Sequence, residues 1–414
     1  MPSTNEEAVF EEMAAIKREA AAKTGLSDFG DPSFEGPLLA WLADLRNPKI
    51  SEFGRKFLRR LALRDLCRRL KVLSYLTEHP EVLELEIPPI VFVTGAARTG
   101  STLLHNLLAT HPDCRALLRW ELMEPLPPPR SETFATDPRI GTLQASIEPL
   151  RGSRLEQMHW VDADEPDENT WAFLNCTGML GRGATPLMRT WARWMVENDF
   201  RATYREFRKV VQLLISKCPP PPHGHLVLKC VMTTMKIAEF ADVFPEASFV
   251  ITHRDPFRAL VSSCATGDAI CQAFLEAPPG PLSEDGLHGQ EAFRSLKMVL
   301  RALVEFADSG SARFVNVRYS DLMSDAVATT RSIYERLEMN PPEDLQARIA
   351  DHLRKQRSGK RAAPPESLET FGYDADAVWS DPIVTEYCES FGVERERSRM
   401  VDTRTASRPA EENI

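Results

Sequence analysis

The sequence predicts an α/β fold in which helices flank a P-loop-like, doubly wound parallel sheet, with an added helical N-terminal region. The first observation is residues 90–104, IVFVTGAARTGSTLL, where an apolar β-branched strand runs into a glycine-bearing turn and then into helically spaced leucines. The second is that three further apolar segments, 226–229, 247–252 and 313–317, alternate with helical patterns. Because parallel strands need crossover connections, this order predicts a parallel sheet.

The N-terminal region, residues 1–85, is expected to be helical and to precede the main α/β domain at 86–414. Apolar residues recur at helical spacing in 6–23, 37–45 and 55–76. The last of these segments, RKFLRRLALRDLCRRLKVLSYL, is strongly basic. We expect its basic side to be a solvated helix face, with a membrane or partner surface as the alternative.

Composition and charge bound the classes of function. The chain has 414 residues, 43% of them hydrophobic, so it can bury a large core. Its formal net charge of −10 argues against broad nucleic-acid binding, so an anion site must be built from a few placed cations. The eight cysteines are scattered without metal-ligand spacing, which indicates reduced thiols. No apolar run reaches bilayer length and the start is charged, so we expect a cytoplasmic protein without a transmembrane segment.

The first glycine-bearing turn has the spacing of a phosphate-binding loop. Gly95 and Gly100 are separated by four residues and are followed by Ser101 and Thr102, which nearly gives the nucleotide P-loop, but serine stands where that motif has lysine. The cation inside the loop is Arg98, which suits an anion less charged than a triphosphate. A helix that begins at about Ser101 would direct its N-terminal amides at such an anion.

A second anion site is predicted at the end of the 247–252 strand. The strand ends in H-R-D-P, and Pro256 suits the first position of a following helix. Arg254 therefore stands at the carboxyl end of a strand, where it can converge with Arg258 and Ser262 of the helix on one oxyanion. Since the carboxyl ends of parallel strands meet at one edge of a sheet, we expect two neighbouring phosphate sites.

These two motifs resemble those of the sulfotransferases that use 3′-phosphoadenosine 5′-phosphosulfate (PAPS). Residues 98–102, RTGST, are similar to the family's 5′-phosphosulfate loop, and Arg254 with Ser262 is similar to its 3′-phosphate motif. The resemblance covers about 88–373 and is nearest to the bacterial-type and tyrosylprotein-type branches. It implies that PAPS spans both turns and leaves as the bisphosphate PAP, and that Tyr319 faces the adenine.

In the expected chemistry the protein aligns the acceptor, the sulfur and the leaving oxygen, and it stabilises the charge on the leaving group. This chemistry requires no metal. Arg98, together with the loop amides, would stabilise charge that develops on the 5′ phosphate. Lys229, at the end of the 226–229 strand, could reach the same oxygens, with an ordinary surface ion pair as the alternative. The expected cofactor-binding residues are thus Arg98, Thr99, Gly100, Ser101, Thr102, Lys229, Arg254, Ser262 and Tyr319.

Several residues are candidates for the general base that takes the proton of the acceptor. The tyrosylprotein branch uses a glutamate after an H-P-D segment, and here Glu121 follows such a segment, two residues further on than in that branch. Burial beside tryptophan and leucines would raise its pKa towards neutrality. Glu124 is the nearest competitor. The cytosolic branch uses a histidine, so His159 is a further candidate, and His105 is expected to lie on a helix surface.

The segment between the two motifs is expected to hold the acceptor. Five of the seven tryptophans fall in a helical insertion at about 120–217, which favours a small apolar or aromatic alcohol or amine, with plain core packing as the alternative. A run of acids after His159 is expected to be a solvated loop, not a metal site. The basic segment 354–361 is either a lid over the nucleotide or a flexible loop.

The sequence therefore predicts a PAPS-dependent sulfotransferase that acts on a small-molecule acceptor, without nucleic acid and with a homodimer left possible. A nucleotide-dependent kinase is the first alternative, because residues 253–255 match the start of a kinase catalytic loop. The asparagine that such a loop needs five residues after the aspartate is leucine here. A nucleotide-binding scaffold without catalysis is the second alternative.

Overall fold

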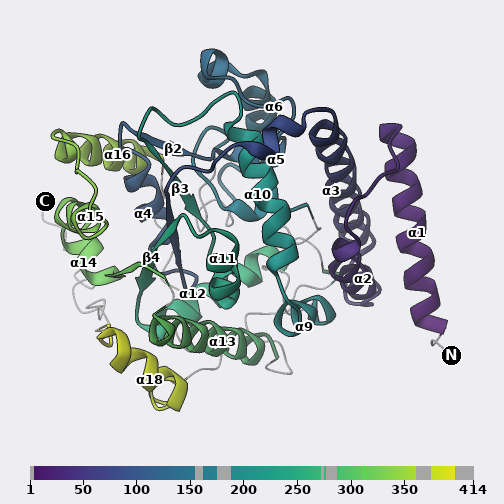
Figure 1. Ribbon diagram of the computed structural model, residues 1–414. Helices are drawn as coiled ribbons and strands as arrows, with labels where there is room; N and C mark the ends of the chain where they lie inside the picture. The colour runs from purple at the N-terminus through teal and green to yellow at the C-terminus, as the bar shows by residue number, and fades with distance from the viewer. Residues whose placement is uncertain are drawn as a thin grey trace, which may run out of the picture.

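The fold is built on one five-stranded sheet (Figure 1). The computed structural model describes residues 4–153, 162–174, 188–271, 275–276, 287–310, 312–359 and 374–396. All neighbouring strands are parallel, in the order β2-β3-β1-β4-β5, which confirms the predicted doubly wound sheet. The strands are β1 Ile90–Gly95, β2 Cys114–Ala116, β3 His225–Lys229, β4 Ala247–His253 and β5 Phe314–Arg318.

The central strand, β1, is buried on both sides, as expected for a parallel sheet covered by helices. Its side chains alternate between two cores. Ile90 and Phe92 belong to the larger core, and Val91 and Val93 belong to the smaller one. This alternation explains why the strand is apolar at each of its first four positions and could be recognised from the sequence.

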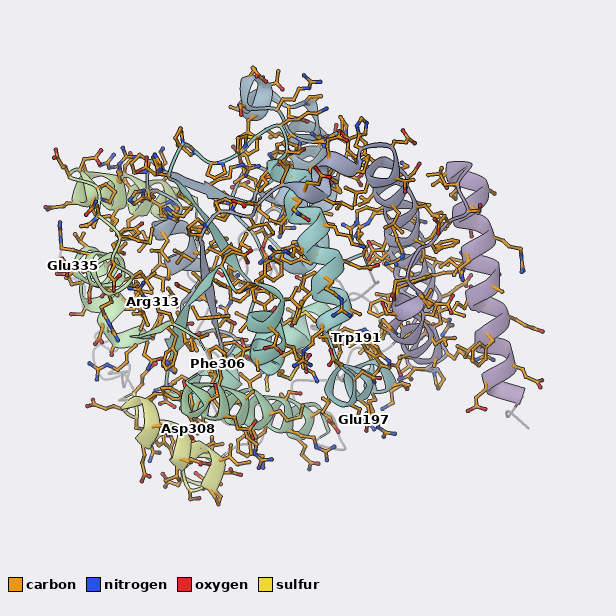
Figure 2. The ribbon with its side chains drawn as sticks, viewed as in Figure 1. Trp191, Glu197, Phe306, Asp308, Arg313 and Glu335 are labelled. Carbon is orange, nitrogen blue, oxygen red and sulfur yellow. The ribbon has the colours of Figure 1, made fainter. Side chains whose placement is uncertain are left out.

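Helices cover both faces of the sheet. The smaller core is closed by α4 Ser101–Leu108, α14 Tyr319–Ser324, α15 Ala326–Arg336 and α16 Leu345–Gly359. The larger core is closed by α10 Arg201–Ile215, α11 Ile237–Val243, α12 Pro256–Cys271 and α13 Leu287–Ser309. On this side Phe306 of α13, labelled in Figure 2, packs against Phe249 of β4, and the ring centroids are 5.1 Å apart.

Shorter elements are described as well. Within the described ranges, the other α-helices after β1 are α5 Arg119–Met123, α6 Pro138–Ile147, α9 Arg189–Glu197, α17 Ala375–Trp379 and α18 Pro382–Phe391. The 3₁₀-helices of the same ranges are η1 Pro32–Phe34, η2 Pro80–Glu84, η3 Ser131–Thr136, η4 Glu148–Leu150, η5 Asn169–Ala172 and η6 Met232–Lys236. In the described part of the chain, no helix combines the length and the apolar content that crossing a bilayer requires.

The N-terminal region is helical, as predicted, and contains α1 Thr4–Thr24, α2 Glu35–Asp44 and α3 Glu52–Glu78. In Figure 1 these helices stand side by side at the edge of the molecule opposite α15 and α16. Ser51 caps α3 by accepting a hydrogen bond from the Gly54 amide at 2.9 Å. Apolar residues of all three helices belong to the larger core, so this region packs continuously with the sheet domain.

The expectation of a solvated basic face on α3 is wrong for two of its arginines. Arg68 and Arg69 are buried. Arg68 donates to the Phe173 carbonyl at 2.9 Å, and Arg69 donates to Glu206 of α10 at 2.6 Å. Buried arginines are retained only where acceptors surround them, so these residues fasten α3 to the rest of the protein instead of facing water.

Candidate active site

The turn between β1 and α4 requires its two glycines. Gly95 has φ 136°, and a Cβ there would lie 2.4 Å from the carbonyl oxygen of Thr252 on β4. Gly100 caps α4 with φ 90°, and a Cβ there would lie 2.9 Å from the ring of Tyr319. Side chains rarely adopt such φ values, so only glycine allows β4 and Tyr319 to approach the loop this closely.

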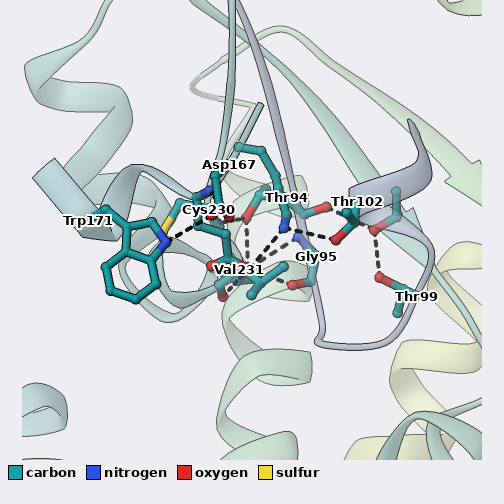
Figure 3. Close-up of polar contacts among 12 residues, drawn as sticks. Thr94, Gly95, Thr99, Thr102, Asp167, Trp171, Cys230 and Val231 are labelled. Carbon is teal, nitrogen blue, oxygen red and sulfur yellow. Dashed lines mark hydrogen bonds and ion pairs between the residues drawn. The ribbon is translucent and has the colours of Figure 1, made fainter. Parts of the chain in front are cut away.

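Threonines at the strand ends hold the loop in place (Figure 3). The hydroxyls of Thr94 and Thr234 are 2.7 Å apart, and Thr234 also donates to the Gly95 carbonyl at 2.8 Å. Thr99, predicted to bind the cofactor, hydrogen-bonds Thr252 at 2.6 Å and lies buried. Its side chain therefore fixes the shape of the loop.

The two predicted phosphate motifs touch each other. Arg254 donates to the carbonyl oxygen of Arg98 at 3.1 Å, and Arg98 donates to the Ser262 hydroxyl at 2.9 Å. The guanidinium of Arg254 also lies 4.1 Å over the ring of Tyr319. The structure thus brings Arg98, Arg254, Ser262 and Tyr319 together, although 156 residues separate the two arginines.

The electrostatics of this edge suit an anion. Burial lowers the pKa of Arg98, and the neighbouring charge of Arg254 lowers it further. For Arg254, burial opposes the charged form, but its hydrogen bonds with Glu396 leave the pKa raised overall. Two adjacent guanidinium groups repel each other, and Glu396 offsets the charge of one of them, so a further anion would be stabilised here. Ser101 is buried in the first turn of α4.

One alternative for Lys229 was an ordinary ion pair at the surface, but the residue is buried. It is 1% exposed at the carboxyl end of β3. Its ammonium donates to the Thr102 hydroxyl at 3.0 Å and to Glu168 Oε1 at 3.0 Å. A cation from the neighbouring strand therefore reaches the first turn of α4, close to the place where a P-loop carries its own lysine.

The acid run is also more buried than predicted. Asp167 lies 2.6 Å from Arg119 and accepts from the Trp171 indole at 3.1 Å (Figure 3), and Glu168 holds Lys229. The solvated-loop interpretation is wrong for both acids, which are buried. Over the described ranges, no group of three potential metal ligands comes together.

His105 is buried as well, not exposed on the surface of α4 as expected. Burial and, after it, the charge of Lys229 lower its pKa to about 3. The imidazole is therefore neutral at any working pH. It adds a fourth titratable group to the cluster of Lys229, Asp167 and Glu168, all of which act on it electrostatically.

Glu121, a candidate for the base, is fully buried in the structure. Its carboxylate is 0% exposed and accepts from Arg115 through both oxygens, at 2.7 and 2.5 Å. Oε1 also accepts from the Leu118 amide at 2.8 Å, which caps α5. This carboxylate is held by structural partners, so an acceptor proton has no obvious place on it. Glu124, at the end of α5, is exposed.

Two expectations fall wholly or partly outside the described residues. His159 lies outside them. Of the basic segment 354–361, Arg354 and Lys355 lie on α16 and both pair with Asp351, at 3.1 and 2.9 Å. Nothing in these contacts assigns the segment to the nucleotide site.

Sequence reasoning missed Glu168 and Glu396. The usable signal for Glu168 was Trp171, an apolar neighbour that argues against full solvation of the acid run. Glu396 gave no local signal, because its partner Arg254 lies 142 residues away. It pairs with Arg254 Nε at 2.6 Å, and its amide donates to Asp255 at 2.8 Å.

Comparison with known proteins assigns the chain. Residues 89–343 match the sequence model of the sulfotransferase family. The structure is similar to that of sulfotransferase STF9 from Mycobacterium avium, with a TM-score of 0.82 and 28% identity over 92% of this chain and 97% of that one. Sulfotransferase STF1 from Mycobacterium tuberculosis H37Rv shares the fold, with a TM-score of 0.75 and 22% identity over 91% and 98%. No curated protein matches the sequence. The chain belongs to the sulfotransferase family.

Proposed function

We propose that this protein transfers the sulfuryl group of PAPS to a hydroxyl or amine of a small organic acceptor and releases PAP. The observation that carries the proposal is the contact between Arg254 and the Arg98 carbonyl, because it sets two cationic turns side by side at one sheet edge. A nucleotide with a phosphate at each end of its ribose matches such a pair of sites better than a nucleotide with one phosphate group.

In this proposal the residues divide between the two ends of the nucleotide. The N-terminus of α4, with Ser101, Thr102 and Arg98, takes the 5′ phosphosulfate. Arg254 and Ser262 take the 3′ phosphate, and Tyr319 bounds the nucleoside. Lys229, which already contacts Thr102, is placed to stabilise charge on the oxygen that leaves with the 5′ phosphate.

The acceptor class remains a proposal with weaker support. Trp120, Trp171 and Trp191 are buried, and Trp191 packs against Trp41 with ring centroids 6.3 Å apart. These tryptophans contribute to the core, so they favour an apolar or aromatic acceptor less than the sequence alone suggested. The cytoplasmic location, independence from metal and the possible homodimer likewise stay predictions.

The contacts of Asp255 argue against the kinase alternative. The aspartate of its supposed catalytic loop, Asp255, accepts from the Phe257 amide at 2.9 Å and from the Glu396 amide at 2.8 Å. It therefore begins α12 and fastens the chain after α18, which is a structural role. Serine at the lysine position of the loop also argues against a triphosphate.

The experiment is a transfer assay with purified protein, PAPS labelled in its sulfuryl group, EDTA, and pooled phenols, sterols, lipids and peptides. We expect a labelled product from at least one pool and none from an Arg98→Ala control. PAP binding without transfer to any pool would favour the scaffold. Consumption of ATP that depends on magnesium would favour the kinase.

A further inference from the structure

A buried polar cluster adjoins the phosphate loop on the side away from the two arginines. It contains Lys229 at the end of β3, Thr102 on α4, and Asp167 and Glu168 just before η5. Lys229 is the centre of the cluster, because its ammonium contacts Thr102 and Glu168 at 3.0 Å each. The ammonium thus links the first turn of α4 to a carboxylate.

We propose that Glu168 is the general base that removes the proton from the acceptor during sulfuryl transfer. The inference rests on the proposed function and adds a residue to it. Thr102 lies in the first turn of α4, where the 5′ phosphosulfate would bind, and one ammonium group separates it from Glu168. An acceptor hydroxyl that approaches the sulfur beside Lys229 comes within hydrogen-bond reach of this carboxylate.

The other carboxylates near the site are committed elsewhere. Asp167 accepts from Trp171 and from the Glu168 amide, and it pairs with Arg119. Glu121 is held through both oxygens by Arg115. Of the carboxylates compared, Glu168 is the one whose ion partner also contacts the loop. The Glu168 side chain is buried, so few water molecules screen its charge.

The step balances in atoms and charge. The acceptor oxygen forms a bond to sulfur, its proton passes to the Glu168 carboxylate, and the bond between sulfur and the 5′-phosphate oxygen breaks with its electron pair on that oxygen. Before transfer, Lys229 is neutralised by Glu168. After Glu168 is protonated, the ammonium is left to pair with the charge that has just appeared on the leaving oxygen. Glu168 returns its proton to water when products leave.

The test is Glu168→Gln, which keeps the size of the side chain and an oxygen for Lys229 but cannot take the proton. We expect kcat to fall by roughly 100-fold or more, while PAP affinity measured by calorimetry stays within about threefold of wild type. In wild type, kcat should fall at low pH because the base becomes protonated. The residual kcat of Glu168→Gln should not show this fall. Glu168→Asp should recover part of kcat. Glu165→Gln is the matched control, because this neighbouring acid pairs with Asn106 at 3.4 Å and should leave kcat near wild type.

Wild-type kcat in Glu168→Gln, in an enzyme that transfers sulfuryl groups, would overturn the inference and leave the proposed function standing. No transfer by the wild-type protein would end the proposed function instead. If the single variant unfolds, the double variant Lys229→Met with Glu168→Gln removes both charges, and a wild-type pH profile in it would reject a base at this position. A variant that folds and loses PAP binding along with turnover would show that Glu168 is only structural.

Discussion

Two arginines of this protein each hold a glutamate through two hydrogen bonds, and they differ in what surrounds them. Arg69 and Glu206 join α3 to α10, and their side chains are 0% and 7% exposed. Arg254 and Glu396 join the end of β4 to the chain after α18, and theirs are 19% and 33% exposed. The same chemistry therefore occurs both inside the core and at the candidate active site.

The difference shows which ion pair can exchange its partner. Arg69 also donates to the carbonyls of Phe29 and Asp31, at 2.6 and 2.8 Å, so protein acceptors surround it. Arg254 has the positive Arg98 beside it. In the function we propose, a phosphate replaces the carboxylate of Glu396 at Arg254, which costs little because this pair is partly exposed, whereas removal of Glu206 would leave a buried charge. The inner pair holds the fold together, and the outer pair marks a place for an anion.

The largest expected effect is on the inner pair. Arg69→Met should lower the free energy of unfolding by about 3–5 kcal/mol, because Glu206 is left buried without its cation. Urea denaturation measures this loss, and the folded variant should bind PAP as wild type does. A loss below about 1 kcal/mol would show that Glu206 tolerates burial without its cation. Restored stability in Arg69→Met with Glu206→Gln would show that the unpaired carboxylate causes the loss.

Glu121→Gln should behave like a change to the inner pair and not like a change to the active site. We expect the free energy of unfolding to fall by about 3 kcal/mol, since Arg115 would lose its charged partner in a buried position. Turnover per folded molecule should be retained. A normal stability with turnover reduced a hundredfold would return Glu121 to the role of base.

The smallest expected effect is on the outer pair. Glu396→Gln should leave stability unchanged within about 1 kcal/mol, because partly exposed ion pairs contribute little. PAP should bind up to about fivefold more tightly, since the carboxylate that competes for Arg254 has lost its charge. Calorimetry measures the gain. Weaker binding would mean that Glu396 positions Arg254 for the phosphate instead of competing with it.

The sequence predicted those parts of the fold and the site that local patterns encode. The loop after β1 and the turn after β4 carry glycine, arginine and proline signals within a few residues, and both took the expected form. Strand β2, Cys114–Ala116, is three residues long and too short to show a period. The burial of Lys229 and Glu168 depends on contacts between residues 61 positions apart, so charge alone suggested a solvated surface.

Helix α3 is a second case in which the sequence did not predict the burial of charged residues. Its arginines recur as they would on a solvated helix. Two of them are buried because distant parts of the chain supply acceptors, among them Phe173 and Glu206, which lie more than a hundred residues later. Helical spacing predicts that a helix forms. It does not predict which charged residues will find partners inside.

The most direct measurement is a calorimetric comparison of PAP with adenosine 5′-phosphate, on the wild-type protein and on Arg254→Ala. If Arg254 holds a 3′ phosphate, wild type should bind PAP roughly 10- to 150-fold more tightly than the monophosphate, from a charge-assisted contact of about 1.5–3 kcal/mol, and the variant should bind the two alike. A preference for PAP that survives in Arg254→Ala would contradict the account.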